Sequence, residues 1–152
     1  MTQPADHLST RRGGQVFTTR IALRWADMDA LGHLNNATSL SLLEEARLQF
    51  LLRGDQTGVR LTGILAARHE IDYVVPVFYS QQPVSVCMWI DRIGRTSFTM
   101  GAEVHDQAGA LAIRCKTVMV CIATDGSGPT PIPDDWRTEL SDYLAVAKPG
   151  SG

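Results

Sequence analysis

The sequence lacks the long apolar segment that a membrane-spanning helix would need. No stretch among its 152 residues reaches the roughly 18 consecutive apolar residues that cross a bilayer. Residues 1–14, which read MTQPADHLSTRRGG, contain no apolar core and are unlike a signal peptide. We therefore expect a cytoplasmic protein that has no membrane partner.

The sequence also contains few cysteines and has a net charge close to zero. The three cysteines, Cys87, Cys115 and Cys121, lie among apolar residues, and no pair of them has the spacing of metal ligands. An odd number of such residues is typical of buried thiols in a reducing compartment. The formal net charge is −2 and no run of Lys or Arg stands out. Nucleic acids and anionic membranes are therefore not expected as partners.

The sequence does contain enough apolar residues for one core. Hydrophobic residues make up 44% of the chain and charged residues 20%, as in an ordinary globular domain. Apolar and polar side chains alternate over residues 15–25, which predicts a half-buried strand. Residues 37–53 contain good helix formers and neither Gly nor Pro. Their wide apolar face predicts an enclosed helix whose start is capped by Asn35 or Asn36.

Four strand-like segments follow the predicted helix and are separated by turn signals. They span residues 64–75, 84–93, 96–105 and 111–122. The last three are typical of an antiparallel meander in which each strand has one apolar face. The predicted helix is the only element long enough to cover that face, so the expected fold class is α+β. Such a sheet has unpaired edges, and a dimer that joins two sheets edge to edge would protect them.

One folded domain is expected, over residues 15–123. Residues 1–14 are polar and contain Gly, which predicts a flexible segment before this domain. Residues 124–152 form a predicted C-terminal extension that begins with a connection rich in Gly, Pro and Ser. Within it, the segment DDWRTELSDYLA predicts a short helix with Asp134 as its N-cap.

The segment from Asp27 to Asn36, DMDALGHLNN, stands at the junction between the first predicted strand and the predicted helix. The first N–H groups of a helix have no partner within it, and the helix dipole adds positive potential there. A carboxylate just before such a terminus can act as a base or a nucleophile, while the terminus holds a developing oxyanion. This junction is therefore the candidate active site.

The junction, RWADMDALGHLNN, and the helical segment LLEEAR together resemble the 4-hydroxybenzoyl-CoA thioesterase-like acyl-CoA thioesterases of the hotdog fold. The segments IDYVVPVFYSQQPVSV and RIGRTSF resemble the later strands and hairpin of that family, so the resemblance covers about residues 15–122. It implies an antiparallel sheet wrapped around one long central helix. It also implies hydrolysis of acyl-CoA to a free acid and CoA, no metal or organic cofactor, and active sites at the interfaces of a homodimer or homotetramer.

The same resemblance assigns the catalytic roles. It implies that Asp29 is the catalytic carboxylate, either as a base that activates water or as a nucleophile. The backbone N–H of Asn36 would then polarise the thioester carbonyl. His33 would orient the substrate or take part in proton transfer, although a hydrogen bond that organises the loop is an equally simple role.

Further residues are candidates for substrate binding. Asp27 and Asn35 belong to the motif, but each can equally brace the loop, Asp27 by pairing with Arg24. Ser97 lies in RIGRTSF, where the resemblance suggests contact with the substrate or CoA and a plain hairpin role is the alternative. Basic residues suited to the CoA phosphates are Arg92, Arg95, Arg114 and Lys116, and a solvated face of the sheet is the alternative for all four.

Three alternatives remain open from the sequence. Another hotdog branch carries its catalytic carboxylate on the central helix, where this chain has Glu44 and Glu45. A hotdog hydratase or dehydratase would need motifs of the PxHxD or DxNPxH type, which are not matched here. A non-catalytic acyl-CoA-binding protein would be expected to lack the carboxylate that Asp29 supplies.

His69, on the apolar side of its predicted strand, is interpreted as a hydrogen-bonded core histidine.

Overall fold

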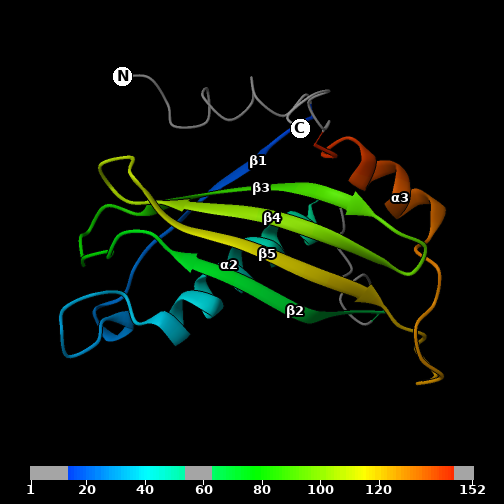
Figure 1. Ribbon diagram of the computed structural model, residues 1–152, viewed down its shortest axis with the longest axis horizontal. Coiled ribbons are helices and arrows are strands. Elements are labelled where there is room, and N and C mark those ends of the chain that lie inside the picture. The colour runs from blue at the N-terminus through cyan, green and yellow to red at the C-terminus, as the bar shows by residue number, and fades with distance from the viewer. Residues whose placement is uncertain (1–13, 54–62, 146–152) are drawn as a thin grey trace, which may run out of the picture.

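The computed structural model describes residues 14–53 and 63–145. Its core is an antiparallel sheet with the strand order β1-β3-β4-β5-β2. The five strands are β1 (Phe17–Ile21), β2 (Ile64–Tyr73), β3 (Val84–Ile93), β4 (Ser97–His105) and β5 (Leu111–Cys121). Strands β3, β4 and β5 form the predicted meander, while β1 and β2 are the two edges (Figure 1).

One long helix, α2 (Asn36–Leu52), crosses one face of this sheet (Figure 1). The apolar side of α2 is buried against the strands, whose side chains on this face of the sheet are also apolar. The buried core includes Leu43, Ala46 and Phe50 from the helix and Val86 and Ile90 from β3. The predicted α+β arrangement, a sheet around one central helix, is therefore confirmed. Within the described residues, no helix is long and apolar enough to cross a membrane.

Most element boundaries agree with the sequence prediction to within two residues. The clear exception is β1, which ends at Ile21 because Trp25–Asp27 form a turn of 3-10 helix in place of strand. Strand β2 ends at Tyr73, and the backbone N–H groups of Val74 and Val75 both point to the carbonyl of Ala112. Two predicted segments lie largely or partly outside the described residues. Of the predicted flexible segment 1–14 the structure describes Gly14, and of the predicted extension it describes residues 124–145.

The C-terminal helix α3 (Asp134–Ser141) forms as predicted, but its cap differs from the prediction. Pro133 occupies the N-cap and Asp134 is the first helical residue. Asp134 nevertheless suits this place, since a carboxylate in the first turn interacts favourably with the helix dipole.

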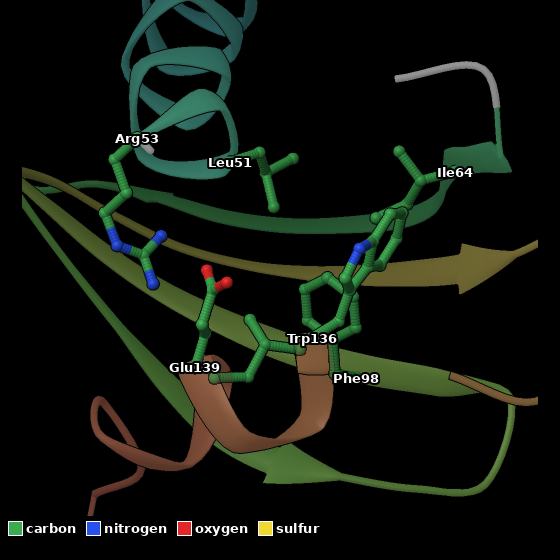
Figure 2. A pocket seen from close by; sticks show the side chains of 7 residues that line it. Leu51, Arg53, Ile64, Phe98, Trp136 and Glu139 are labelled. Carbon is green, nitrogen blue, oxygen red and sulfur yellow. The ribbon is translucent and has the colours of Figure 1, made fainter. Parts of the chain in front are cut away.

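Helix α3 also corrects the expectation that the central helix is the only cover of the sheet. Leu140 is buried in the core, and Arg137 donates from Nη2 to the carbonyl of Gly94 at 2.9 Å. Figure 2 shows Trp136 of α3 next to Phe98 of β4, with Leu51 at the end of α2 nearby. The second helix thus closes the end of the core that α2 leaves open.

The opposite face of the sheet includes one tight contact between neighbouring strands. Gly101 on β4 pairs with Trp89 on β3, and the indole of Trp89 lies directly over the glycine. A Cβ atom at position 101 would lie 2.3 Å from Cε2 and Nε1 of this indole. The ring is fixed in turn, because Nε1 donates a hydrogen bond of 2.7 Å to Asp91.

We therefore expect Gly101→Ala to lower the free energy of unfolding by about 1–3 kcal/mol, the usual cost of overpacking. Urea denaturation followed by circular dichroism measures this. Gly63→Ala is the matched control, because its added Cβ would meet no described atom closer than the Ile122 carbonyl at 3.5 Å. Equal stability of the Gly101→Ala variant and the wild type would contradict the expectation.

Candidate active site

An ion pair between Arg24 and the buried carboxylate of Asp27 fixes the start of the loop. The side chain of Asp27 accepts hydrogen bonds from the Arg24 backbone N–H at 2.7 Å and from the Arg24 guanidinium at 2.8 and 3.1 Å. The guanidinium holds the pKa of the Asp27 carboxyl below its usual value. The Asp27 carbonyl also accepts the Asn35 N–H at 2.9 Å. Asp27 therefore ties the two ends of the loop together.

Asp29 lies in a tight turn that holds one of its two carboxylate oxygens. Oδ1 accepts the backbone N–H groups of Leu31 at 2.9 Å and His33 at 3.2 Å. The turn closes through a hydrogen bond from Gly32 to the Asp29 carbonyl, and Gly32 has a φ of 77°, a conformation that favours glycine. Because Oδ2 accepts no hydrogen bond within the described part of the chain, it is the oxygen left available for chemistry.

The start of α2 is capped in a way that leaves one N–H group free. Of the two cap candidates, the structure selects Asn35, whose Oδ1 accepts the N–H groups of Ala37 at 2.9 Å and Thr38 at 3.1 Å. The next N–H group, from Ser39, bonds to the Asn35 carbonyl at 2.9 Å. Among residues 14–53 and 63–145, nothing accepts a hydrogen bond from the Asn36 N–H. This group is therefore the free donor at the positive end of the helix dipole.

Asp29, His33 and Asn36 all line one cavity of about 600 Å³, a volume that includes its open side. The remaining wall consists of Leu34, Ile113 and the segment Tyr73, Val74, Val75, Pro76 and Val77. A carboxylate and a free N–H at the edge of an apolar wall form a site that suits a reactive carbonyl attached to an apolar group.

The segment after β2 also fixes the position of the loop. The Leu34 N–H donates to the Val77 carbonyl at 2.7 Å, and the His33 ring lies edge-on against Phe78 with 4.9 Å between ring centroids. The His33 side chain makes no hydrogen bond within the described residues. His33 thus contributes its N–H to orient Asp29 and its ring to the wall of the cavity.

The structure does not bring every predicted residue to this cavity. Ser97 and Arg95 lie at the β3–β4 hairpin, and Ser97 pairs with Val120 of β5, whereas Tyr73 at the cavity pairs with Ile113. Seven strand residues separate these positions on β5, which is roughly 23 Å. Within one protomer, Ser97 and Arg95 are therefore remote from Asp29.

The other basic candidates lie elsewhere on the sheet. Arg114 and Lys116 alternate along β5 with residues that face α2, and so they point to the opposite face. Arg114 forms an ion pair with Glu103 at 3.4 Å. No group of His, Cys, Asp and Glu side chains in the described residues has an arrangement that could hold a metal ion.

The two helix carboxylates do not line the cavity that contains Asp29. Glu45 accepts a hydrogen bond of 3.1 Å from Gln49 on its own helix, and Glu44 is exposed. His69 does face α2, and its Nδ1 lies 3.0 Å from the Thr117 hydroxyl. The predicted hydrogen bond of His69 is present, but its predicted burial is wrong because β2 is an edge strand that leaves the residue exposed.

Tyr73 is a polar residue of the cavity that no sequence motif indicated. The sequence indicated only that Tyr73 lies on the same side of its strand as Ile71.

A second cavity, of about 310 Å³, lies at the far end of α2 between Leu51, Phe98 and Trp136 (Figure 2). Among the described residues Glu139 is the one carboxylate that lines it, and the N-terminus of α2 is at the opposite end of the helix, so it lacks the combination found around Asp29.

The family model of the thioesterase-like superfamily matches residues 23–140. The chain belongs to the thioesterase-like superfamily. The match includes the Asp29 loop, α2 and all strands except β1. It confirms the thioester hydrolase family that the junction motif predicted.

Solved structures agree with this membership of the thioesterase-like superfamily. A predicted thioesterase from Bacillus stearothermophilus is 34% identical, with a TM-score of 0.78 over 90% of this chain and 100% of its own. A thioesterase from Thermus thermophilus, solved with coenzyme A and Zn, is 31% identical, with a TM-score of 0.74 over 86% of this chain and 95% of its own.

A 1,4-dihydroxy-2-naphthoyl-CoA thioesterase from Synechocystis shares the fold at 22% identity, with a TM-score of 0.72 over 84% of this chain and 97% of its own. No curated protein matches the sequence at a significant level.

The Asp27–Arg24 pair predicts a pH-dependent effect on stability. Because the folded-state pKa of Asp27 lies below the ordinary value of 3.8, the pair stabilises the fold above that pH and loses its effect as the pH falls further. We expect Asp27→Asn to lower the melting temperature at pH 7 and to lower it less at pH 3. Calorimetry at both pH values measures the difference, and a pH-independent difference would contradict the stated cause.

Proposed function

We propose that this member of the thioesterase-like superfamily hydrolyses acyl-CoA thioesters to a free acid and CoA, with Asp29 as the catalytic carboxylate. The observation that carries the proposal is that Asp29 and Asn36 line one cavity, and that the Asp29 Oδ2 and the Asn36 N–H make no hydrogen bond within the described residues. Among the similar structures, one thioesterase holds coenzyme A and another is named for a CoA thioester, which supports the substrate class.

In the first of two routes, Asp29 acts as a general base. Its Oδ2 takes a proton from a water molecule, and the resulting hydroxide adds to the thioester carbon. The Asn36 N–H donates a hydrogen bond to the oxyanion that forms, where the helix dipole also stabilises negative charge. The C–S bond then breaks, and the thiolate of CoA recovers a proton from Asp29.

In the second route, Asp29 acts as the nucleophile. Its Oδ2 adds to the thioester carbon, the C–S bond breaks, and a mixed anhydride and the CoA thiolate form. Water then hydrolyses the anhydride to the free acid and returns the Asp29 carboxylate, and the second proton of the water goes to the thiolate of CoA. The bonds from Leu31 and His33 to Oδ1 serve both routes, because they fix the plane of the carboxylate and leave Oδ2 directed to the substrate.

The roles of the other site residues follow from their contacts. Asp27 and Asn35 affect the substrate indirectly: Asp27 holds the shape of the loop, and Asn35 caps the start of α2. The ring of His33 lines the cavity, where it orients the acyl group beside the apolar wall. Since Arg95 and Ser97 are remote from Asp29 in one protomer, they contact a substrate in this cavity only if they come from a second protomer.

Such a second protomer is part of the proposal. Strand β2 is a sheet edge, and Leu65, Val74 and Val75 on or just after it are 42%, 49% and 40% exposed. The unpaired N–H and C=O groups of an edge strand are a template for pairing with another chain, and these exposed apolar side chains at its two ends would be buried by it. We therefore propose a homo-oligomer, a dimer or a tetramer, in which β2 edges meet. The cytoplasmic location expected from the sequence remains part of the proposal.

The first test removes the charge of Asp29 and keeps its size. Asp29→Asn should lower kcat for acyl-CoA hydrolysis by at least about 10²-fold, because a carboxamide neither accepts a proton nor forms an anhydride. KM should change little, because the interaction is lost mainly in the transition state. The assay is release of free thiol from a panel of acyl-CoA substrates, from acetyl to palmitoyl and including benzoyl.

Glu44→Gln and Glu45→Gln are the matched controls, since both remove a carboxylate from the adjacent helix and neither residue lines the cavity. Both should remain near wild-type activity. A folded Asp29→Asn variant with most of its activity, together with an inactive Glu44→Gln or Glu45→Gln variant, would transfer the catalytic role to the helix.

The second test concerns assembly through β2. Light scattering at micromolar concentration should report at least a dimer for the wild type. Leu65→Glu should shift the population toward monomer, because it introduces charge at the apolar edge. Arg20→Glu, an exposed position on the other edge strand β1, is the control and should leave the mass unchanged. A stable wild-type monomer would refute the proposed assembly.

A further inference from the structure

The phenol of Tyr73 connects the sheet to the first residue of α2. Its hydroxyl donates a hydrogen bond of 2.7 Å to the carbonyl of Asn36. The Ser39 hydroxyl, buried one turn into the helix, donates to the same carbonyl at 2.5 Å and lies 3.2 Å from the phenol oxygen. Two hydroxyl groups therefore hold the residue whose N–H is the free donor of the site.

A β-bulge determines that Tyr73 faces the helix. Before the bulge, Ala66 pairs with Met119, and after it Arg68 pairs with Val118, so Ala67 is an extra residue in β2. This insertion exchanges the two faces of the strand for all later residues. Without it Asp72, and not Tyr73, would face α2.

The phenol is attached to the end of β2, which is hydrogen-bonded to β5. Tyr73 pairs with Ile113 of β5, and the following N–H group, from Val74, donates to the Ala112 carbonyl at 2.8 Å. By contrast, the first turn of a helix is where helices fray. The bond from Tyr73 therefore transfers the fixed position of the strand to the terminus of α2.

Positioning matters here because the value of an oxyanion donor depends on its geometry. A donor contributes fully only when it lies about 2.7–3.1 Å from the place where the oxyanion forms. The caps from Asn35 fix the N–H groups of Ala37 and Thr38 but do not reach that of Asn36. Tyr73 and Ser39 restrain Asn36 through its backbone carbonyl.

We propose that Tyr73 is a positioning residue for thioester hydrolysis, which aligns the Asn36 N–H with the thioester carbonyl by holding the Asn36 carbonyl against β2. The proposal rests on the proposed function of Asn36. The single phenolic hydrogen is used in this bond, so Tyr73 donates no hydrogen bond to the substrate. The effect of Tyr73 therefore falls on kcat and not on substrate affinity.

Kinetics of Tyr73→Phe provide the first readout. We expect kcat to fall about 10-fold, less than the roughly 10²-fold loss typical of removing an oxyanion donor, with KM within about twofold of wild type. Tyr143→Phe is the control, because Tyr143 packs on Phe50 at 5.0 Å and its hydroxyl bonds no described residue. An unchanged kcat, or a raised KM with unchanged kcat, would overturn the proposal.

Carbonyl polarisation provides a second readout that a purely structural role would not change. The probe is hexanoyl-CoA or benzoyl-CoA, whichever the wild type hydrolyses faster, labelled with ¹³C at the thioester carbonyl. It is bound to the Asp29→Asn variant, which slows its hydrolysis, and the carbonyl stretch is read by infrared difference spectroscopy. We expect a shift to lower frequency with Tyr73 present and a smaller shift after Tyr73→Phe.

The outcomes separate the two proposals. If the bound carbonyl shows no shift even with Tyr73 present, the role of Asn36 in the proposed function fails. If the shift is present and Tyr73→Phe leaves it unchanged, Asn36 keeps its role and the positioning role of Tyr73 fails. Should Tyr73→Phe not fold by circular dichroism, Tyr73→Leu, which also removes the hydroxyl, is read in the same way, and an unchanged kcat and shift in that variant would overturn the proposal.

Discussion

The site depends on how the side chain of Asn35 distributes its hydrogen bonds at the start of α2. Its single oxygen accepts from Ala37 and Thr38, and this stabilises the helix terminus as any asparagine cap does. Because the geometry of the cap excludes the first helical residue, the Asn36 N–H stays free. A helix that satisfied all its terminal donors would be more stable, but it would offer nothing to a substrate carbonyl.

The contacts around this terminus hold the catalytic parts from three directions. Asp27 ties the beginning of the loop to its end through Arg24 and the Asn35 N–H. The turn at Asp29 fixes the proposed catalytic carboxylate through backbone groups only, so its geometry does not rely on long side chains. The segment after β2 supports the loop at Leu34. The site is therefore held rigidly by the protein before any substrate arrives, which is the arrangement that favours catalysis by preorganised groups.

Much of this site is local in sequence, and for that reason it was predictable. The alternatives for the helix cap, the carboxylate before the terminus and the face of each strand in the meander all follow from spacings of a few residues. What escaped prediction depends on long-range pairing. The role of Tyr73 requires the bulge at Ala67, which no local pattern reveals, and the docking of α3 requires Arg137 to reach carbonyl groups on a distant hairpin. The remoteness of Ser97 from Asp29 likewise follows from strand register, which the motif RIGRTSF does not contain.

Strand β2 contributes to two features of the molecule. Its last residue, Tyr73, lines the cavity, and the strand itself is an open edge of the sheet. In the proposed assembly a second protomer pairs with this edge, so that binding at the cavity and association share one strand and are coupled thermodynamically. A ligand that restricts β2 would then alter the free energy of association, and association would alter the affinity for the ligand by the same factor. The concentration of the protein would in that case influence how well its site is formed.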